Sequence, residues 1–282
     1  MQNALGSVAP PRNKSSSLRR ALDILQSLIE PTSNKRGASL SEIAASTAMN
    51  KSTLLRLIEP LCDAQLVEHG SDGRYRVGIW SVTLGGAYLA GLDMRYEARR
   101  ILERLALETG ETLHLLLFVQ GEVSYIEKIT GPSSIQMASR IGDRMPAYCT
   151  ASGKVFLAYL PEVNFEESVA AGMPARTPNT ITSPELLQDE LKKTRERGYA
   201  IDDMENEIDI RCLSVPVFGR DGQIVSAISI SGLAARFDKA RITQLAHIVQ
   251  RGAEELSRRL GAPSTFPIPT TEETNSKEDV HK

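Results

Sequence analysis

The sequence predicts an α+β protein with two domains. Apolar residues recur at three- and four-residue spacing between residues 17 and 63, which predicts helices. From Glu111 onward, runs rich in Leu, Val and Ile predict strands. The length of 282 residues agrees with two domains, because domains average about 150 residues.

The first two helices are indicated by apolar spacing and by a cap. From Ser17, apolar side chains fall on one helical face until Pro31 ends the segment. Ser39 and Glu42 then form a capping box, in which the hydroxyl and the carboxylate each satisfy a free backbone N–H. We therefore expect a short second helix at 39–47.

A third helix and a hairpin complete this part of the chain. Asn50 can cap a helix with a leucine- and isoleucine-rich core face. The runs at 66–69 and 74–77 flank Gly70-Ser-Asp-Gly73 and predict a β-hairpin. Three short helices followed by a hairpin are typical of a winged helix-turn-helix, whose third helix enters the major groove of DNA.

The middle of the chain predicts two further helices. Residues 78–91 carry no charge and predict a helix that packs against something large. Residues 92–109 predict an amphipathic helix. Because Trp80 and Tyr88 add apolar area, we expect the uncharged helix to pair with the same segment of a second chain, giving at least a dimer.

The rest of the chain predicts a sheet with helices between its strands. Strands are expected at 112–119, 122–129, 134–140, 199–204, 211–218 and 223–231, and helices at 150–160, 183–197 and 238–260.

Composition excludes several classes of protein. With 41% hydrophobic and 24% charged residues, the chain is neither wholly disordered nor collagen-like. Three cysteines are too few for a disulfide framework, which indicates a reducing compartment. No apolar run approaches the roughly 18 residues of a membrane span, and the N-terminus lacks the apolar core of a signal peptide. We therefore expect a soluble, cytoplasmic protein with no membrane partner.

Charge and residue type suggest a DNA-contacting surface. Residues 1–78 carry a net charge of +3 and the remainder carries −5. This asymmetry suggests a polyanion as partner, and the alternative is a chance fluctuation in the charge distribution. Arginine can bind guanine through two hydrogen bonds, and serine and threonine can contact bases or phosphates. The alternative is a trihelical packing unit with a solvated polar face. The candidate DNA-binding residues are Lys51, Ser52, Thr53, Arg56, Arg74 and Arg76.

Two predicted strands present faces of small residues. Because strand side chains alternate, Ser229 and Ser231 share one face, and Cys212 and Ser214 share a face of the neighbouring strand. Thr150-Ala-Ser-Gly-Lys opens a helix, whose free N-terminal amides favour an anion. This combination predicts a small organic acid as ligand. The alternative for the two serines is hydrogen bonding to neighbouring backbone.

The acidic segment that contains Asp202, Asp203, Glu205 and Glu207 has two interpretations. It is either a solvated turn or a turn that directs one carboxylate inward, toward a ligand hydroxyl or carboxyl. Cys212 is expected to be a small pocket residue rather than a redox sensor, because no sequence neighbour suggests a lowered thiol pKa.

Enzyme and metal motifs fail on inspection. Gly153-Lys154 is followed by Val155, and Tyr148 stands where a P-loop needs its first glycine. Ser152 is preceded by Thr150 at the position where a nucleophile elbow needs glycine. The 4 histidines are scattered, with no metal-ligand spacing. We expect no catalytic residue, no metal and no cofactor.

Long motifs carry a family resemblance. The N-terminal part contains SLRRALDILQSL, LSEIAASTAMNKSTLLRLIEPL and GRYRVGIWSVTLG. The second half contains IGDRMPAYCTASGKVFLAYLP, ARTPNTIT, RERGYAIDDMENEIDIRCLSVPVF and GQIVSAISISG. Together these motifs resemble the IclR family of bacterial transcription regulators, from about Ser17 to Gly261. Pro60 departs from the family pattern, because it removes the hydrogen bond to the Arg56 carbonyl and should kink the third helix.

The resemblance implies a domain order and a ligand site. It implies a winged helix-turn-helix DNA-binding domain (17–78), linker helices (79–109) and a GAF/PAS-like effector-binding domain with an antiparallel sheet (110–262). Composition separately predicts a disordered arm (1–16), which is rich in Pro, Ser and Asn, and a disordered tail (263–282), which is polar and contains proline. The resemblance also implies dimers or tetramers on palindromic operators. The implied effector contacts are the backbone of Ala151 and Ser152 and the side chains of Asp202, Cys212, Ser229 and Ser231.

We therefore predict a ligand-responsive transcriptional regulator and not an enzyme. A small organic acid in the C-terminal domain would modulate binding of double-stranded operator DNA by the N-terminal domain. The alternative from another class is an enzyme or small-molecule carrier built on the C-terminal domain, with the N-terminal part as a dimerisation module.

Overall fold

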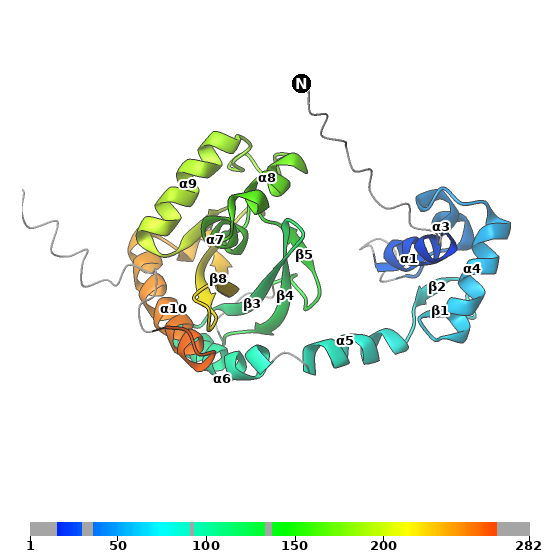
Figure 1. The fold of residues 1–282 in the computed structure, drawn as a ribbon, viewed down its shortest axis with the longest axis horizontal. Helices are drawn as coiled ribbons and strands as arrows, with labels where there is room; N and C mark the ends of the chain where they lie inside the picture. The colour runs from blue at the N-terminus through cyan, green and yellow to red at the C-terminus, as the bar shows by residue number, and fades with distance from the viewer. Residues whose placement is uncertain (1–15, 30–35, 91–92, 133–136, 264–282) are drawn as a thin grey trace, which may run out of the picture. The chain divides into compact units, whose positions relative to one another are not determined.

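The computed structural model describes residues 16–29, 36–90, 93–132 and 137–263 (Figure 1). These residues form two compact units, which divide between Gly91 and Leu92. The arm expected at 1–16 and the tail expected at 263–282 lie outside the described residues, apart from Ser16 and Pro263. Within the described ranges, no helix is both long and apolar enough to cross a membrane.

The first unit contains the expected helices and hairpin. Its elements are α1 (Ser16–Ile29), α3 (Leu40–Ser46), α4 (Lys51–Asp63), β1 (Val67–His69), β2 (Tyr75–Val77) and α5 (Trp80–Ala90). β1 and β2 pair antiparallel. Helices α1, α3 and α4 and the hairpin enclose one core, which includes Ile24, Leu28, Ile43, Leu54, Ile58 and Val67. These buried positions are the apolar face of each helix, as the spacing predicted.

Side-chain caps set the start of α3 and α4. Ser39 and Glu42 make both hydrogen bonds of the predicted capping box. The Asn50 side chain accepts a hydrogen bond from the Thr53 amide at 2.8 Å. Helix α4 continues past Pro60 to Asp63, so the proline does not end it. The α4 residues expected to contact DNA lie in its first two turns, on the N-terminal side of this proline.

Helix α5 carries an apolar stripe that is exposed in the described part of the chain. Trp80, Leu84 and Tyr88 follow one another at four-residue spacing, so they lie on one side of the helix. They are 43%, 47% and 58% exposed, respectively. A helix that is apolar all round is ordinarily buried, whereas this stripe of α5 is exposed among the described residues.

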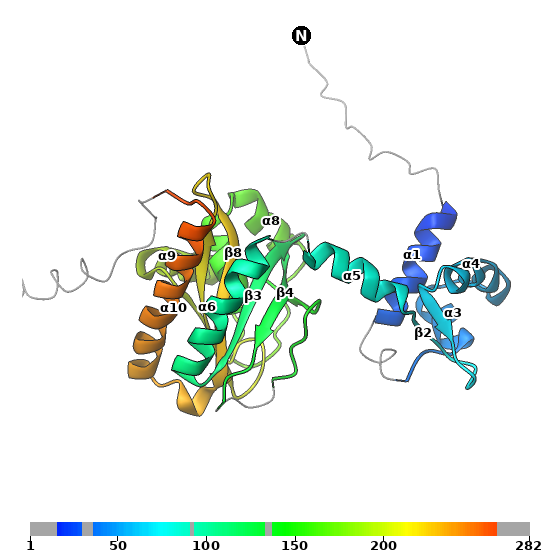
Figure 2. The ribbon, with the colours of Figure 1, turned by 90° about the horizontal axis from the view of Figure 1, so that it is seen from below.

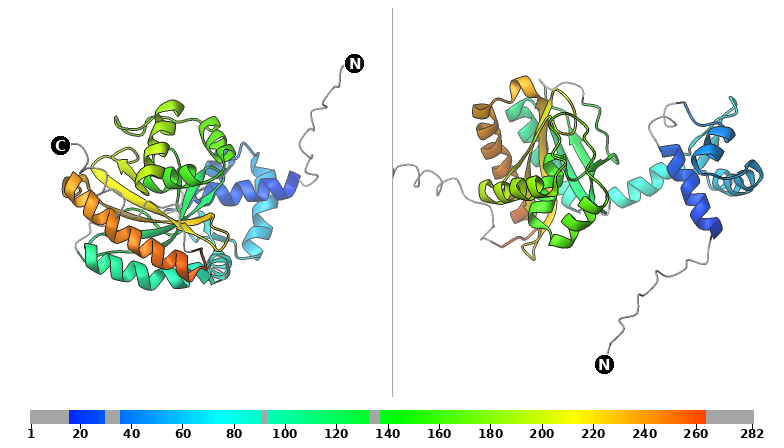
Figure 3. Two further views of the ribbon diagram at one scale, coloured as in Figure 1. Left: turned by 60° about the vertical axis from the view of Figure 1, so that its left-hand side comes forward. Right: turned by 90° about the horizontal axis from the view of Figure 1, so that it is seen from above.

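The second unit is a sheet between two helical layers. Its elements are α6 (Asp93–Thr109), β3 (Thr112–Val119), β4 (Glu122–Ile129), β5 (Arg144–Pro146), α7 (Ala151–Tyr159), α8 (Glu162–Ala170), α9 (Pro184–Arg197), β6 (Ala200–Asp203), β7 (Ile210–Phe218), β8 (Ile224–Leu233), the 3-10 turn η1 (Ala234–Arg236) and α10 (Lys239–Arg259). The described strands form an antiparallel sheet in the order β5-β4-β3-β8-β7-β6. Helices α6 and α10 pack side by side on one face, and α7 covers the other, with α8 and α9 beyond it (Figures 2 and 3).

The strand predicted at 134–140 is wrong. Residues 134–136 lie outside the described residues, and 137–140 have no strand pairing. The carbonyls of Met137 and Ser139 instead accept hydrogen bonds from the Lys128 ammonium, at 2.8 and 2.7 Å. The third strand in chain order is β5, which pairs with β4 after a turn at Gly142. The sequence also gave no indication of α8.

Candidate functional site

The face of α4 that was expected to read DNA is exposed. Lys51, Ser52 and Arg56 are exposed and Thr53 is half-buried. The Ser52 hydroxyl donates to the Asn50 side chain at 2.8 Å, so it takes part in the helix cap. Among the described residues, neither Lys51 nor Arg56 has an ion-pair partner. These two cations are therefore available for an external anion or base.

The two hairpin arginines already hold carboxylates. Arg74 Nη1 lies 2.9 Å from Glu42 Oε2, and Arg76 pairs with Asp72. The Arg76 side-chain hydrogen bond lowers the pKa of Asp72 to about 2. A phosphate would have to compete with these carboxylates, although solvent-exposed ion pairs are weak. The sequence predicted the positions of both arginines but not their partners.

Strand register brings the predicted effector residues together in the second unit. Ser231 on β8 lies directly opposite Cys212 on β7, and Cys212 lies opposite Asp202 on β6. Ser229 lies opposite Ser214 in the next row of the same face. Directly opposed residues project to one side of a sheet, so these side chains are neighbours. The predicted alignment of two faces of small polar residues is confirmed.

Helix α7 covers this face and adds its N-terminus to it. Ser152 Oγ lies 3.0 Å from Ser214 Oγ, which ties the first turn of α7 to the sheet. The Thr150 side chain caps the helix by accepting from the Gly153 amide at 3.2 Å. The amides of Ala151 and Ser152 have no acceptor among the described residues. Two free N–H groups therefore lie at the positive end of a helix.

Gly153 permits the close approach of α7 to the preceding loop. A Cβ at this position would lie 2.1 Å from the Ala147 carbonyl oxygen, which no rearrangement of a side chain could relieve. The glycine that resembled part of a phosphate-binding loop is therefore a packing residue.

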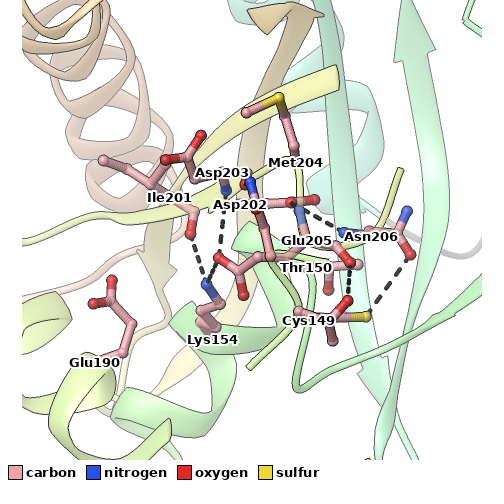
Figure 4. A network of polar contacts seen from close by, with 12 residues as sticks. Cys149, Thr150, Lys154, Glu190, Ile201, Asp202, Asp203, Met204, Glu205 and Asn206 are labelled. Atoms are coloured by element: carbon pink, nitrogen blue, oxygen red, sulfur yellow. Dashed lines mark hydrogen bonds and ion pairs between the residues drawn. The ribbon is translucent and has the colours of Figure 1, made fainter. Parts of the chain in front are cut away.

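A buried ion pair supports the strand end that carries Asp202. The Lys154 ammonium reaches from α7 to the Glu205 carboxylate and donates to the Ile201 carbonyl at 2.8 Å (Figure 4). The side chains of Lys154 and Glu205 are only 1% and 6% exposed. Asp202 Oδ1 accepts from the Glu205 and Asn206 amides at 2.7 and 3.2 Å. Together these contacts fix the turn after β6.

The acidic segment is therefore neither of the two arrangements that the sequence suggested. Asp202 and Glu205 are both buried, whereas Asp203 and Glu207 are exposed. One inward carboxylate was expected and two are present, because Lys154 compensates the charge of the second. Spacing within the segment gave no sign of this, and the one available signal was a lysine in an otherwise apolar helix.

Burial controls the protonation of the groups on this face. It raises the pKa of Asp202 to about 7, although the two backbone hydrogen bonds and Lys154 oppose the shift. Burial and the nearby Asp202 raise the pKa of the Cys212 thiol. A thiol that stays protonated is a poor nucleophile and metal ligand, which agrees with the expectation that Cys212 is not a redox sensor. Within the described ranges, no cluster of His, Cys, Asp or Glu side chains could hold a metal ion.

Sequence reasoning missed two residues of this face. Thr112 and His114 on β3 lie opposite Ser231 and Ser229, respectively. Together with Asp202, Cys212 and Ser214, they complete a surface that we call the polar face. Thr112 and His114 were assigned only to an apolar strand, because their neighbours TLHLLLFV are mostly leucine.

Two family models account for most of the chain. A model described as the bacterial transcriptional regulator IclR C-terminal domain matches residues 86–258, and the IclR helix-turn-helix model matches residues 17–70. The chain belongs to the IclR family of bacterial transcriptional regulators. The predicted identity as a DNA-binding transcriptional regulator is thereby confirmed, together with the two-part fold of this IclR protein.

Individual IclR relatives agree with this assignment. The HTH-type transcriptional regulator XynR of Escherichia coli is 35% identical, over 88% of this chain and 98% of its own. The IclR structure from Thermotoga maritima has a TM-score of 0.68 and 38% identity, covering 87% of this chain and 98% of that one. A homologue from Microbacterium hydrocarbonoxydans in complex with 4-hydroxybenzoate shares the fold, with a TM-score of 0.74, 24% identity and 87% and 99% coverage.

Proposed function

We propose that this regulator binds a small organic acid at the polar face and that the bound acid changes its affinity for operator DNA. The observation that carries the proposal is the meeting of two free amides, on Ala151 and Ser152, with the hydroxyls of Ser229 and Ser231. A carboxylate there would gain charge-assisted hydrogen bonds, which are stronger than neutral ones. The role proposed for the face is binding alone, without a catalytic step, in the cytoplasm where the operator lies.

An anion can bind at the polar face only when Asp202 is protonated. The positive charge of Lys154 is already compensated by Glu205, so it is not available to a ligand. Asp202 would repel an anion when ionised. Because burial raises the pKa of Asp202 to about 7, the carboxyl can be protonated near neutral pH and then donate to the acid.

The proposed DNA interface uses α4 and the hairpin differently. Arg56 reads a base edge, and Lys51, Ser52 and Thr53 contact bases or phosphates near it. Arg74 and Arg76 neutralise phosphates. The exposure of the α4 residues and the absence of an ion-pair partner for Arg56 among the described residues support this division.

We propose that α5 pairs with α5 of a second chain. The stripe formed by Trp80, Leu84 and Tyr88 supports this, since these three side chains are 43–58% exposed among the described residues. A two-fold dimer would place two half-sites about one turn of DNA apart, ~34 Å, or a multiple of that. Sedimentation at micromolar concentration tests the proposal, and a monomer there would contradict it.

A gel shift on the DNA upstream of the chain's own gene tests the proposed function. Keto, hydroxy and aromatic acids, including 4-hydroxybenzoate, are added singly, and at least one is expected to change the operator affinity. The double variant Ser229→Ala with Ser231→Ala should bind DNA normally but respond less to that acid. A response only to a cation or a neutral amine, or an unchanged response of the double variant, would overturn the acid assignment.

A further inference from the structure

Two buried polar atoms on β3 have no hydrogen-bond partner among the described residues. They are Thr112 Oγ1 and His114 Nδ1. The two residues are 0% and 1% exposed, respectively. Buried side-chain polar atoms are paired in the large majority of cases, so two unpaired atoms two residues apart on one strand call for a partner.

Both atoms belong to the polar face. Thr112 lies opposite Ser231, and His114 lies opposite Ser229. The serines are the hydroxyl residues to which the effector carboxylate was assigned above. Their residues therefore adjoin the serines proposed to hold the ligand, on the strand next to β8 and away from Asp202 on β6.

The imidazole of His114 is held in place by its other contacts. Its Nε2 lies 2.9 Å from Ser139 Oγ, and its ring meets the Tyr125 ring edge-on at 4.8 Å between centroids. The neighbouring Lys128 is engaged by backbone carbonyls and is not aimed at Nδ1. Rotation of the ring would break the Ser139 contact, so Nδ1 keeps its orientation.

The chemistry of the two atoms indicates what they would bind. Burial and the charge of Lys128 lower the pKa of His114 to about 3, so the imidazole is neutral at physiological pH. A neutral imidazole nitrogen donates or accepts according to its tautomer, and a threonine hydroxyl does either. A carboxylate only accepts and an ammonium only donates. A hydroxyl group both donates and accepts, so it can pair with Thr112 Oγ1 and His114 Nδ1 whichever of them is the donor.

We propose that Thr112 and His114 recognise a hydroxyl group of the effector, so that this protein selects a hydroxy acid over the same acid without the hydroxyl. The inference rests on the proposed function, in which the carboxylate lies at the α7 N-terminus. A site that offers buried polar groups to a hydroxyl rejects an analogue lacking it, because those groups then stay unpaired.

The test uses calorimetric titration with pairs of acids that differ by one hydroxyl, namely 4-hydroxybenzoate with benzoate and lactate with propionate. The parent should bind the hydroxy member of at least one pair tenfold or more tightly. In Thr112→Val and in His114→Phe, the ratio of the two Kd values should fall severalfold toward 1. The Kd of the acid without the hydroxyl should stay unchanged. Equal weakening of both members, or an unchanged preference, would overturn the inference.

A ligand-free measurement separates this inference from the proposed function. Thr194 is as buried as Thr112, but its hydroxyl donates to the Glu190 carbonyl at 2.9 Å. Thr194→Val should therefore lower the melting temperature, whereas Thr112→Val should leave it unchanged or raise it. If no acid binds the parent, the proposed function fails, and this comparison still decides whether the Thr112 hydroxyl is unpaired. An equal drop in both variants would show that it is already satisfied.

Discussion

The proposed DNA-contacting surface and the polar face differ in how far apart in the sequence their residues lie. Four of the six predicted DNA contacts fall within one and a half turns of α4, between Lys51 and Arg56. The polar face draws on β3, α7, β6, β7 and β8, which are separated by up to 119 residues from Thr112 to Ser231. The residues of the first surface are exposed or half-buried, whereas those of the second are almost entirely buried.

The difference shows which forces place each set of residues. A local cap and the helical repeat determine which side chains of α4 point outward, so the neighbours of each residue are known from spacing. On the polar face, neighbours are set by strand register, and a shift of one residue would turn Ser229 and Ser231 to the other side of the sheet. The positions of its side chains therefore depend on the tertiary fold, whereas those of the α4 side chains depend on the local helix alone.

The largest effect is expected from Lys154→Met. It leaves the Glu205 carboxylate buried without its cation, and breaking such a pair costs about 3–5 kcal/mol of unfolding free energy. The exposed pair of the first unit provides the control, because Arg74→Met should hardly change stability. Scanning calorimetry measures both. Restoration of stability by adding Glu205→Met would attribute the loss to the unpaired charge, and equal effects of the two single variants would contradict the comparison.

Arg56→Ala should have the next largest effect, on DNA binding alone. Loss of a bidentate base contact costs about 1–3 kcal/mol and relaxes specificity at one position of each half-site. Stability should not change, because the side chain is exposed and has no ion-pair partner among the described residues. Gel shifts with operator and with single-base variants measure the effect at one fixed salt concentration. Parent-like binding would mean that another face of α4 reads the DNA.

Ligand binding at the polar face should depend on pH through Asp202. The pKa of Asp202 rises from 3.8 to about 7, so an acid should bind with constant affinity below that pH and weaken up to about tenfold per unit above it. Asp202→Asn should abolish this dependence. Since the folded state keeps the proton, the same carboxyl also lowers folding stability as the pH rises from about 4 to about 7. Calorimetry between pH 6 and 9 tests the binding, and a flat parent profile would show that Asp202 does not face the acid.

The smallest effect is expected from Arg76→Ala. The variant should weaken binding similarly for all DNA sequences and reduce the salt dependence by about one phosphate contact. Asp72→Asn is the matched control, because it frees Arg76 from its carboxylate and should strengthen binding. Binding isotherms over a salt series measure the slope. A sequence-specific loss in Arg76→Ala would assign this arginine to base reading.

Individual elements show which structural features could be predicted from the sequence. The caps at Ser39 and Asn50 were predictable because each uses residues within three positions. The strand at 144–146 was misplaced at 134–140, since the pairing of β5 with β4 depends on a turn at Gly142 and on Lys128 binding the intervening carbonyls. The second inward carboxylate, Glu205, was missed because its cation is 51 residues away.

The sequence by itself determined the helices of the first unit, the exposed side of α4 that carries Lys51 and Arg56, and the alternation that puts Cys212 with Ser214 and Ser229 with Ser231. These features depend on interactions within a few residues, whose geometry the helical and strand repeats fix. Only the tertiary structure decided that Thr112 and His114 join those serines and that Lys154 compensates Glu205. Both depend on which strands and helices meet, and the free energy of those contacts comes from groups far apart in the chain.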